Sequence, residues 1–376
     1  MSKFLFQATV IVALLMLLVA LRLRNRTPDV RTTIREGSVD PKPLPACTDA
    51  EIEVAFDVLP EYQPTDLADF IRVQNGQLMI GEEQFYVRGV NYYPAKYPWR
   101  RFLTQTDMET IDKEFALLQS VEFNTLRIFL WNEALFMCPG SGAVPVADAF
   151  LRLDGIVQKA AVYGFRLIVT LNDLPDLTDY PLYDNPPHIL AQTGFIVQRY
   201  RDEAAILAWD IRNEGDIDYD RGAFTHDTVL DWLGQTSASV RSLDANHLIT
   251  AGWLHDSEAT IPYVDIVSFH HWSGVPQAHN RIVELQKATD KPVLLEEFGY
   301  STHGMDLASQ AIITGEMIYE VEAMNVAGWL IWTAFDFPTD ATCTPPNCPS
   351  EDNAEHHFGL WYPDYTPKHV VNALTP

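Results

Sequence analysis

The length, composition and charge of the chain limit what kind of protein it is. It has 376 residues, of which 47% are hydrophobic and 20% charged, as is ordinary for a globular protein with a well-filled core. Its 51 acidic residues outnumber the 26 Lys and Arg, and the formal net charge is −25. An acidic surface of this kind repels polyanions, so we expect no nucleic acid among the partners.

The chain begins with a hydrophobic segment. Residues 4 to 21 carry no charge, and a helix of this length, rising ~1.5 Å per residue, nearly crosses a hydrocarbon core ~30 Å thick. The run is longer than the core of a usual signal peptide, and no clear small-x-small cleavage site follows it. We predict that residues 1–26 are an uncleaved anchor in the lipid bilayer, with a cleaved signal sequence as the alternative, and that residues 27–46 form an extended tether.

Two features disagree about the side of the membrane on which the rest of the chain lies. Three Arg at residues 22–26 follow the segment, and the positive-inside rule alone would place the domain in the cytoplasm. An even number of cysteines behind an export-like segment instead favours disulfides and an extracytoplasmic domain; they are Cys47, Cys138, Cys343 and Cys348. We predict the second arrangement, a membrane-anchored and extracytoplasmic catalytic domain.

The last two cysteines, Cys343 and Cys348, bracket a Pro-rich turn that a disulfide could close. Free thiols are one alternative. A zinc site is the other, but no CxxC or matching His spacing accompanies either pair of cysteines.

From residue 47 onward, short apolar strands alternate with amphipathic helical patterns, which is typical of parallel βα units. Eight strands are predicted at residues 85–91, 125–130, 166–172, 206–213, 248–253, 265–272, 292–299 and 328–335. Helices are predicted near residues 107–121, 148–163, 188–203, 225–243, 277–289 and 306–325. We therefore predict one α/β domain over residues 47–376, a (β/α)8 TIM barrel. A doubly wound sheet is the alternative, but no GxGxxG or GxxxxGK[ST] motif follows the first strand.

Polar and aromatic side chains follow nearly every predicted strand, at the end where barrel enzymes place their active sites. They are Asn91, Tyr92, Arg127, Asn172, Asp173, Asn213, Glu214, Trp253, His270, Trp272, Glu297, Trp332 and Asp336. Glu214 follows the fourth strand and Glu297 the seventh, so the two would face each other across the ring. Cleavage of a glycosidic bond needs such a pair, a proton donor and a carboxylate opposite, ~5–5.5 Å apart if configuration is retained.

Several motifs at these strand ends resemble those of clan A glycoside hydrolases, in particular the cellulase and β-mannanase family. The motifs are the Asn-Glu pair in WDIRNEGD (209–216), the Glu before Phe-Gly in KPVLLEEFG (291–299), RGVNYYP (88–94), the Arg of LRI (126–128), the His of SFHHW (268–272) and the Trp-rich GWLIWTAFDF (328–337). The resemblance runs from about residue 73 to the end of the chain, and the order and spacing of the motifs make it specific.

This resemblance implies a retaining O-glycosyl hydrolase that acts on β-mannan or β-glucan by double displacement. Glu214 would be the acid/base and Glu297 the nucleophile, and the anionic nucleophile would raise the pKa of Glu214. Arg127 would keep Glu297 ionised, while Asn213 would bind the sugar 2-hydroxyl. The other side chains expected to contact the substrate are Tyr92, Asn172, His270, Trp272 and Trp332, with Trp332 as the sugar platform.

Two strand ends depart from the family pattern. The family often carries His-x-Tyr after strand six, where this chain has His270, His271 and Trp272. It often has a His after strand three, where this chain has Asn172 and Asp173. Both departures affect the identity of the sugar more than the class of reaction.

Some neighbouring residues imitate the proposed catalytic pair. Glu296 precedes Glu297, but strand alternation should send the two side chains to opposite faces, and the family motif selects Glu297. Asn132 and Glu133 repeat the Asn-Glu motif after strand two, where we expect only a loop. Tryptophans such as Trp253 and Trp329 are more typical of a core than of a sugar platform.

Two further functions are compatible with such a barrel. One is a catalytically silent, glycan-binding accessory subunit, with the other members of a membrane protein complex as its partners. The other is a metal-dependent hydrolase, but His270 and His271 are not accompanied by a second His-x-His or an Asp-rich strand end. We therefore predict a polysaccharide or oligosaccharide substrate, no metal and no other cofactor.

Overall fold

The computed structural model describes residues 44–174, 177, 182–183, 186–343 and 348–374. The predicted anchor at residues 1–26 and the tether up to residue 43 lie outside the described residues, and what we expect of them stays a prediction. Within the described part of the chain, no helix is long and apolar enough to cross a membrane. Residues 44–376 group into a single unit by their internal contacts.

Eight parallel strands form the central sheet. They are β4 (Val87–Asn91), β5 (Thr125–Phe129), β8 (Arg166–Thr170), β9 (Ile206–Asp210), β10 (Leu248–Thr250), β11 (Val267–His270), β12 (Val293–Phe298) and β13 (Gly328–Ile331). Their order in the sheet is β10-β9-β8-β5-β4-β13-β12-β11. The two outer strands are joined by a parallel bridge between Trp253 and Phe269 and by a 2.6 Å hydrogen bond between the hydroxyls of Thr250 and Ser268. The sheet is thereby closed, and the predicted (β/α)8 barrel is confirmed.

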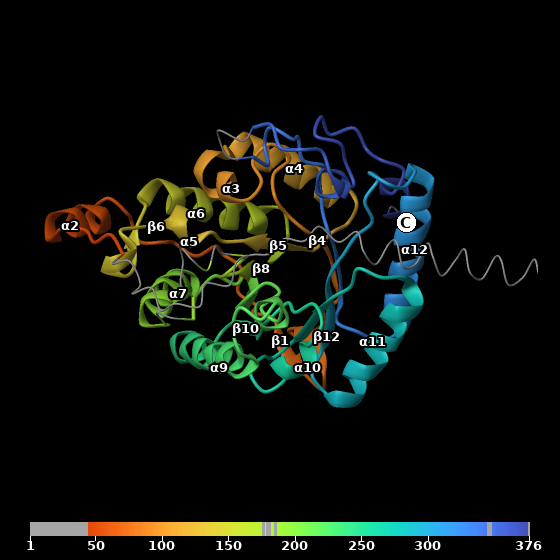
Figure 1. Ribbon diagram of the computed structural model, residues 1–376, viewed down its shortest axis with the longest axis horizontal. Helices are drawn as coiled ribbons and strands as arrows, with labels where there is room; N and C mark the ends of the chain where they lie inside the picture. Colours follow the sequence, from red (N-terminus) through yellow and green to blue (C-terminus); the bar gives the residue numbers. More distant parts are fainter. Residues whose placement is uncertain (1–43, 175–176, 178–181, 184–185, 344–347, 375–376) are drawn as a thin grey trace, which may run out of the picture. The chain divides into compact units, whose positions relative to one another are not determined.

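Helices surround this barrel, as Figure 1 shows. The six predicted helices are present as α4 (Met108–Ser120), α6 (Ala147–Val162), α7 (Pro186–Tyr200), α9 (His226–Leu243), α11 (Val275–Ala288) and α12 (Leu307–Ala323). Shorter helices in the connections are α3 (Arg100–Gln105), α5 (Asn132–Leu135), α8 (Ile217–Asp220), α10 (Ser257–Thr260) and α13 (Val371–Leu374), with 3-10 turns η1 (Pro139–Ser141) and η2 (Ala354–His357). Because helices cover the outside and side chains fill the inside, every residue of β5, β8, β9 and β12 is buried.

A small antiparallel sheet that the sequence analysis did not predict precedes the barrel. It consists of β1 (Arg72–Gln74), β2 (Gln77–Ile80) and β3 (Glu83–Gln84). Ile71 and Leu78 pack in one apolar cluster with residues at the amino ends of the barrel strands, among them Val87, Leu248 and Leu294. This sheet therefore lies at the amino end of the barrel, and the carboxyl ends of the strands are left for a functional site.

Two disulfides brace the connections. Cys47 is bonded to Cys138, next to the two-stranded sheet of β6 (Phe136–Met137) and β7 (Val144–Pro145), and Cys343 is bonded to Cys348. The first bond ties helix α2 (Asp49–Asp57), which begins with a capping box at Thr48, to the connection between β5 and α6. The prediction of disulfides is confirmed. The same connection contains α5, so Asn132 begins a short helix rather than lying in a loop.

Candidate active site

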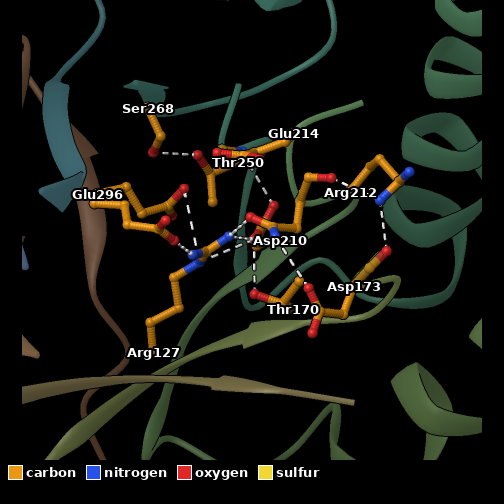
Figure 2. Close-up of polar contacts among 12 residues, drawn as sticks. Arg127, Thr170, Asp173, Asp210, Arg212, Glu214, Thr250, Ser268 and Glu296 are labelled. Carbon is orange, nitrogen blue, oxygen red and sulfur yellow. Dashed lines mark hydrogen bonds and ion pairs between the residues drawn. The ribbon is translucent and has the colours of Figure 1, made fainter. Parts of the chain in front are cut away.

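Arg127 lies at the centre of the site, on β5, with its guanidinium inside the barrel and fully buried. It donates to Asp210 on β9 (Nη2 to Oδ2, 2.7 Å) and to Glu297 on β12 (Nη1 to Oε2, 2.9 Å). It also donates to the side-chain oxygens of Asn91 at 3.0 Å and Asn213 at 2.8 Å. Because these donors form a rigid planar fork, Arg127 fixes the nucleophile candidate and Asn213 relative to each other. Figure 2 shows this guanidinium beside Asp210 and Glu296.

Glu214 follows β9 in an uncommon backbone conformation. Its φ is +49°, in the left-handed region that non-glycine residues seldom adopt, and its N–H donates to the carbonyl of Gly252 at 2.7 Å. Its Oε1 lies 3.0 Å from Nδ1 of His270 on β11. One oxygen of Glu214, one oxygen of Glu297 and a ring nitrogen of His270 all lie within 4.8 Å of one another. The barrel thus brings together the two carboxylates that the sequence analysis selected.

The protonation of these groups is coupled. Burial raises the pKa of Glu297 to about 7, although the positive charges of His270 and Arg127 act against this. Burial opposes a charge on His270, but the anion of Glu297 and the hydrogen bond to Glu214 outweigh it and raise the pKa of His270 to about 10. Burial also favours protonated Glu214, yet its hydrogen bond to His270 and the nearby positive charges lower its pKa below the ordinary value. The free site therefore favours a charged His270 beside an ionised Glu214.

Glu296 and Glu297 both point into the barrel, and the expectation that alternation sends them to opposite faces is wrong. The Glu296 carboxylate lies 3.9 Å from Nε of Arg127 and 3.9 Å from Nε2 of His270, and Glu297 contacts the same two side chains. The register of β12 against β13 shifts within residues 295–298, so the regular pleat is interrupted there. Glu296 is fully buried, whereas the side chain of Glu297 keeps 7% of its surface exposed and is the member of the pair that a substrate could reach.

A chain of hydrogen bonds supports Asn213 from the side of β8. Its Nδ2 donates to Asp173 at 3.0 Å, the hydroxyl of Tyr93 donates to Asp173 at 2.9 Å, and the indole of Trp131 donates to Tyr93 at 2.8 Å. Asn172 lies beside this chain, 3% exposed, and its amide donates to a main-chain carbonyl at 3.0 Å. Asn213 is therefore oriented by the guanidinium of Arg127 on one side and the carboxylate of Asp173 on the other, while Asn172 braces the strand end.

Tyr92 does not line the site, contrary to the prediction. It is fully buried between the barrel and α4, where its hydroxyl donates to Glu114 at 2.6 Å and its ring packs edge-on against Phe115. The reason is the alternation of side chains: Asn91 points inward to the central arginine, so Tyr92 points outward. Its neighbour Tyr93 takes the place at the mouth of the barrel.

The tryptophans divide into two groups. Trp253 and Trp329 are fully buried, as expected of core residues. Trp332 follows β13, is half-buried, and donates from Nε1 to Oε1 of Glu355 at 3.1 Å. Trp272 is 39% exposed at the end of β11, so it lies at the rim and not in the central network.

Three side chains that the structure places at the site were missed from the sequence. Asp210 stands inside the quoted WDIRNEGD motif, and an acid on a wholly buried strand is a signal that could have been used. The place of Tyr93 at the mouth could have been inferred, because Asn91 points inward and a residue two positions further along the chain should point the same way. Glu355 lies in η2, far beyond the last strand, and no local pattern marks it.

Among the described residues, two groups of three side chains come close enough to hold a metal ion. One is Glu214, His270 and Glu297; the other, on the surface, is His303, Asp352 and His357. In the first group the positive charge next to the carboxylates is already supplied by His270 and the buried Arg127. The expectation of no metal remains a prediction.

Comparison with known proteins agrees with this geometry. The family model described as cellulase (glycosyl hydrolase family 5) matches residues 88–337. Similar curated proteins include a probable mannan endo-1,4-beta-mannosidase F of Neosartorya fischeri, 27% identical with 63% of this chain and 62% of the relative covered, and a mannan endo-1,4-beta-mannosidase A of Aspergillus aculeatus, 26% identical with 58% and 70% covered. The chain spans just under two thirds of the length of the first of these relatives.

Solved structures show the same fold at low sequence identity. The exo-beta-1,4-mannosidase Op5Man5 of Opitutaceae bacterium strain TAV5 superposes with a TM-score of 0.66 at 21% identity, covering 80% of this chain and 60% of that one. The endo-1,4-beta-mannanase of Rhizomucor miehei gives a TM-score of 0.58 at 19% identity, covering 81% and 99%. The barrel and the motifs at its strand ends thus define a clan A glycoside hydrolase. Within that clan, the chain belongs to the cellulase family, glycosyl hydrolase family 5.

Proposed function

We propose that the chain is a retaining hydrolase of β-linked glycans of the β-mannan type, with Glu297 as nucleophile and Glu214 as acid/base. The observation that carries the proposal is the separation of the two carboxylates, which have oxygens within 4.8 Å of each other. Retaining enzymes need carboxyl groups ~5–5.5 Å apart, whereas inverting enzymes leave ~6.5–9.5 Å for a water molecule. The close pair therefore supports double displacement.

The reaction has two steps. In the first, the Glu297 carboxylate attacks the anomeric carbon, the glycosidic C–O bond breaks, and Glu214 gives its proton to the leaving oxygen. In the second, Glu214 takes a proton from water, the water oxygen attacks the anomeric carbon, and the bond to Glu297 breaks. The buried charge of Arg127, 2.9 Å from Glu297, favours the carboxylate as the leaving group of this second step.

The free site holds its proton on His270, whereas the first step needs it on Glu214. The two groups share a hydrogen bond of 3.0 Å, so the proton has only to move along that bond. The move leaves His270 neutral and Glu214 protonated, with Glu297 ionised beside Arg127. We propose that a bound sugar, which displaces water from the carboxylates, favours this arrangement because it removes one buried ion pair.

The proposal for a β-mannan rests on the relatives, several of which are described as mannan endo-1,4-beta-mannosidases. Activity on a panel of β-mannan, β-glucan and aryl β-glycosides tests this proposal, with residues 44–376 as the enzyme. We expect the highest kcat/KM on manno-configured substrates. Highest activity on glucans would change the sugar but keep the mechanism, and no turnover on any β-glycan would refute the function. The site retains both carboxylates, so the alternative of a silent accessory subunit gains no support.

Replacing Glu297 and replacing Glu214 should cause different kinetic defects. Glu297→Ala should lose nearly all turnover on every substrate, because no glycosyl-enzyme can form. Glu214→Ala should lose at least about 10²–10⁴-fold on a natural glycan, yet still form the intermediate from a dinitrophenyl glycoside, and azide should release it as the β-glycosyl azide. Glu109→Ala, which removes an exposed carboxylate on α4, is the matched control and should behave like the wild type. Loss of activity in Glu296→Ala with full activity in Glu297→Ala would reverse the assignment.

We further propose that the domain is membrane-anchored through residues 4 to 21 and lies outside the cytoplasm. The two disulfides, Cys47–Cys138 and Cys343–Cys348, support this because such bonds persist in oxidising compartments. An impermeant thiol reagent applied to intact cells should label the four cysteines only after reduction. Labelling that needs cell lysis and no reductant would place the domain in the cytoplasm.

A further inference from the structure

The turn η2 presents Glu355 to the barrel mouth from a firmly held loop. Asn353 caps the turn, accepting from the N–H of Glu355 at 2.9 Å, and in return donates its own N–H to Nδ1 of His356 at 3.1 Å. The other ring nitrogen of His356, which is buried, lies 2.7 Å from the hydroxyl of Thr342. Caps and a buried anchor thus fix the backbone on both sides of Glu355.

The carboxylate of Glu355 faces the candidate catalytic groups. Its Oε1 accepts from the indole of Trp332 at 3.1 Å, and within the described part of the chain no partner occupies Oε2. Burial, together with the charges of Glu214 and Asp173, raises the pKa of Glu355 to about 7, although the hydrogen bond from Trp332 acts against this. The charge of Glu355 in turn raises the pKa of Glu297. Glu355 is therefore a further carboxyl at the mouth, with one oxygen free at the edge of the expected sugar platform.

The positive groups that contact these carboxyls are already engaged. The fully buried Arg127 is bound to Glu297 on β12, to Asp210 on β9 and to Asn91 on β4. His270 is likewise engaged, 3.0 Å from Glu214. Arg212, 1% exposed, donates to Asp218 at 2.8 Å and to two main-chain carbonyls. A sugar hydroxyl that reached Glu355 would find an acceptor, whereas a sugar carboxylate would meet like charges without a free guanidinium to bind it.

From this arrangement we infer that Glu355 is a substrate-binding residue. It accepts hydrogen bonds from hydroxyls of a neutral sugar on Trp332, and it excludes uronic acid units from the same position. The inference rests on the proposed hydrolase function, because it assumes that the sugar lies against Trp332 next to Glu214. The ligand class it defines is a neutral β-linked glycan.

The test removes the negative charge of Glu355 and keeps the shape of its side chain. Glu355→Gln retains an oxygen for the Trp332 indole, so the loop should stay folded, but the buried ion is gone. We expect kcat/KM for 4-nitrophenyl β-mannoside to fall by about 10- to 100-fold, mainly through KM, which is the usual cost of losing a hydrogen bond to a charged group. The acid limb of the pH profile should move to lower pH, because the charge that raises the pKa of Glu297 is removed. Glu351→Gln, on the exposed part of the same loop, is the matched control and should change neither value.

Binding of two disaccharides separates this inference from the proposed function, because it needs no turnover. Above pH 7, where Glu355 is ionised, calorimetric dissociation constants for mannobiose and for its uronic acid counterpart should differ strongly in the wild type, and their ratio should fall by about tenfold or more in Glu355→Gln. Glu355→Asp keeps the negative charge but places it one methylene further from the sugar. This variant should still exclude the uronate and should lose affinity for mannobiose.

An unchanged ratio in Glu355→Gln, with the pH profile of the wild type, would overturn the inference even if the enzyme hydrolyses mannan. Absence of turnover in the wild type, with the binding ratio as expected, would refute the proposed function and leave the binding role of Glu355 supported.

Discussion

Gly252 lies directly behind the site, and its missing side chain offers a sharp test of how tightly the site is packed. A Cβ at this position would lie 2.6 Å from Nε2 of His270 and 3.0 Å from Nη2 of Arg127, and it would come closer still to Oε2 of Glu296. To restore a separation of about 3.5 Å, the His270 ring has to move by about 0.9 Å, away from its hydrogen-bond distance to Glu214.

Gly252→Ala should therefore disturb catalysis more than folding. A misplacement of about 1 Å costs about 10²-fold in rate, whereas overpacking of this kind costs about 1–3 kcal/mol of stability. We expect kcat on an aryl β-glycoside to fall about 100-fold, with a melting temperature only a few degrees lower. The control is Gly315→Ala on α12, where a Cβ would meet nothing within 4 Å and should leave activity unchanged. Wild-type kcat in Gly252→Ala, or a loss of activity that matches a loss of folded protein, would refute the reasoning.

Three other predictions follow from the contacts described. Because the pKa of Glu297 is about 7 and the nucleophile must be ionised, kcat/KM should fall as the pH drops through about 7; a profile flat down to about pH 5 would contradict this. Tyr93→Phe should lower kcat/KM about tenfold because it releases the acid that orients Asn213, whereas Tyr92→Phe should cost about 1–3 kcal/mol in urea unfolding and leave kcat/KM unchanged. Replacing Cys47 and Cys138 by Ser opens a bond between residues 91 apart in sequence and should lower the free energy of unfolding by about 4–5 kcal/mol; an unaltered urea midpoint would count against the bond.

Features that depend on local sequence pattern were predicted correctly. The eight barrel strands and six long helices could be read from apolar runs and helical periodicity, because both reflect side-chain directions along a single element. Arg127, Asn213, Glu214, His270 and Glu297 were singled out by the resemblance of their motifs to those of the family, and the structure brings them together because parallel strands in a barrel direct their carboxyl ends to one mouth. Their roles stay predictions. The even number of cysteines similarly predicted disulfides, though not that Cys47 pairs with Cys138.

Only the tertiary structure decided how neighbouring side chains share the mouth. A register shift in β12 turns Glu296 inward beside Glu297, and simple alternation cannot anticipate it because the shift depends on pairing with β13. Alternation did hold after Asn91, where it sends Tyr92 to α4 and leaves the mouth to Tyr93.

Glu355 reaches the site through the fold alone. It is distant in sequence from every barrel strand, and a cap, a buried histidine and the indole of Trp332 determine its position. Sequence pattern records the periodicity of one element at a time, whereas a site is made by contacts between elements. The reaction class could therefore be inferred from the sequence, while the hydrogen bond between Glu214 and His270 and the place of Glu355 beside Trp332 depend on contacts that only the folded barrel establishes.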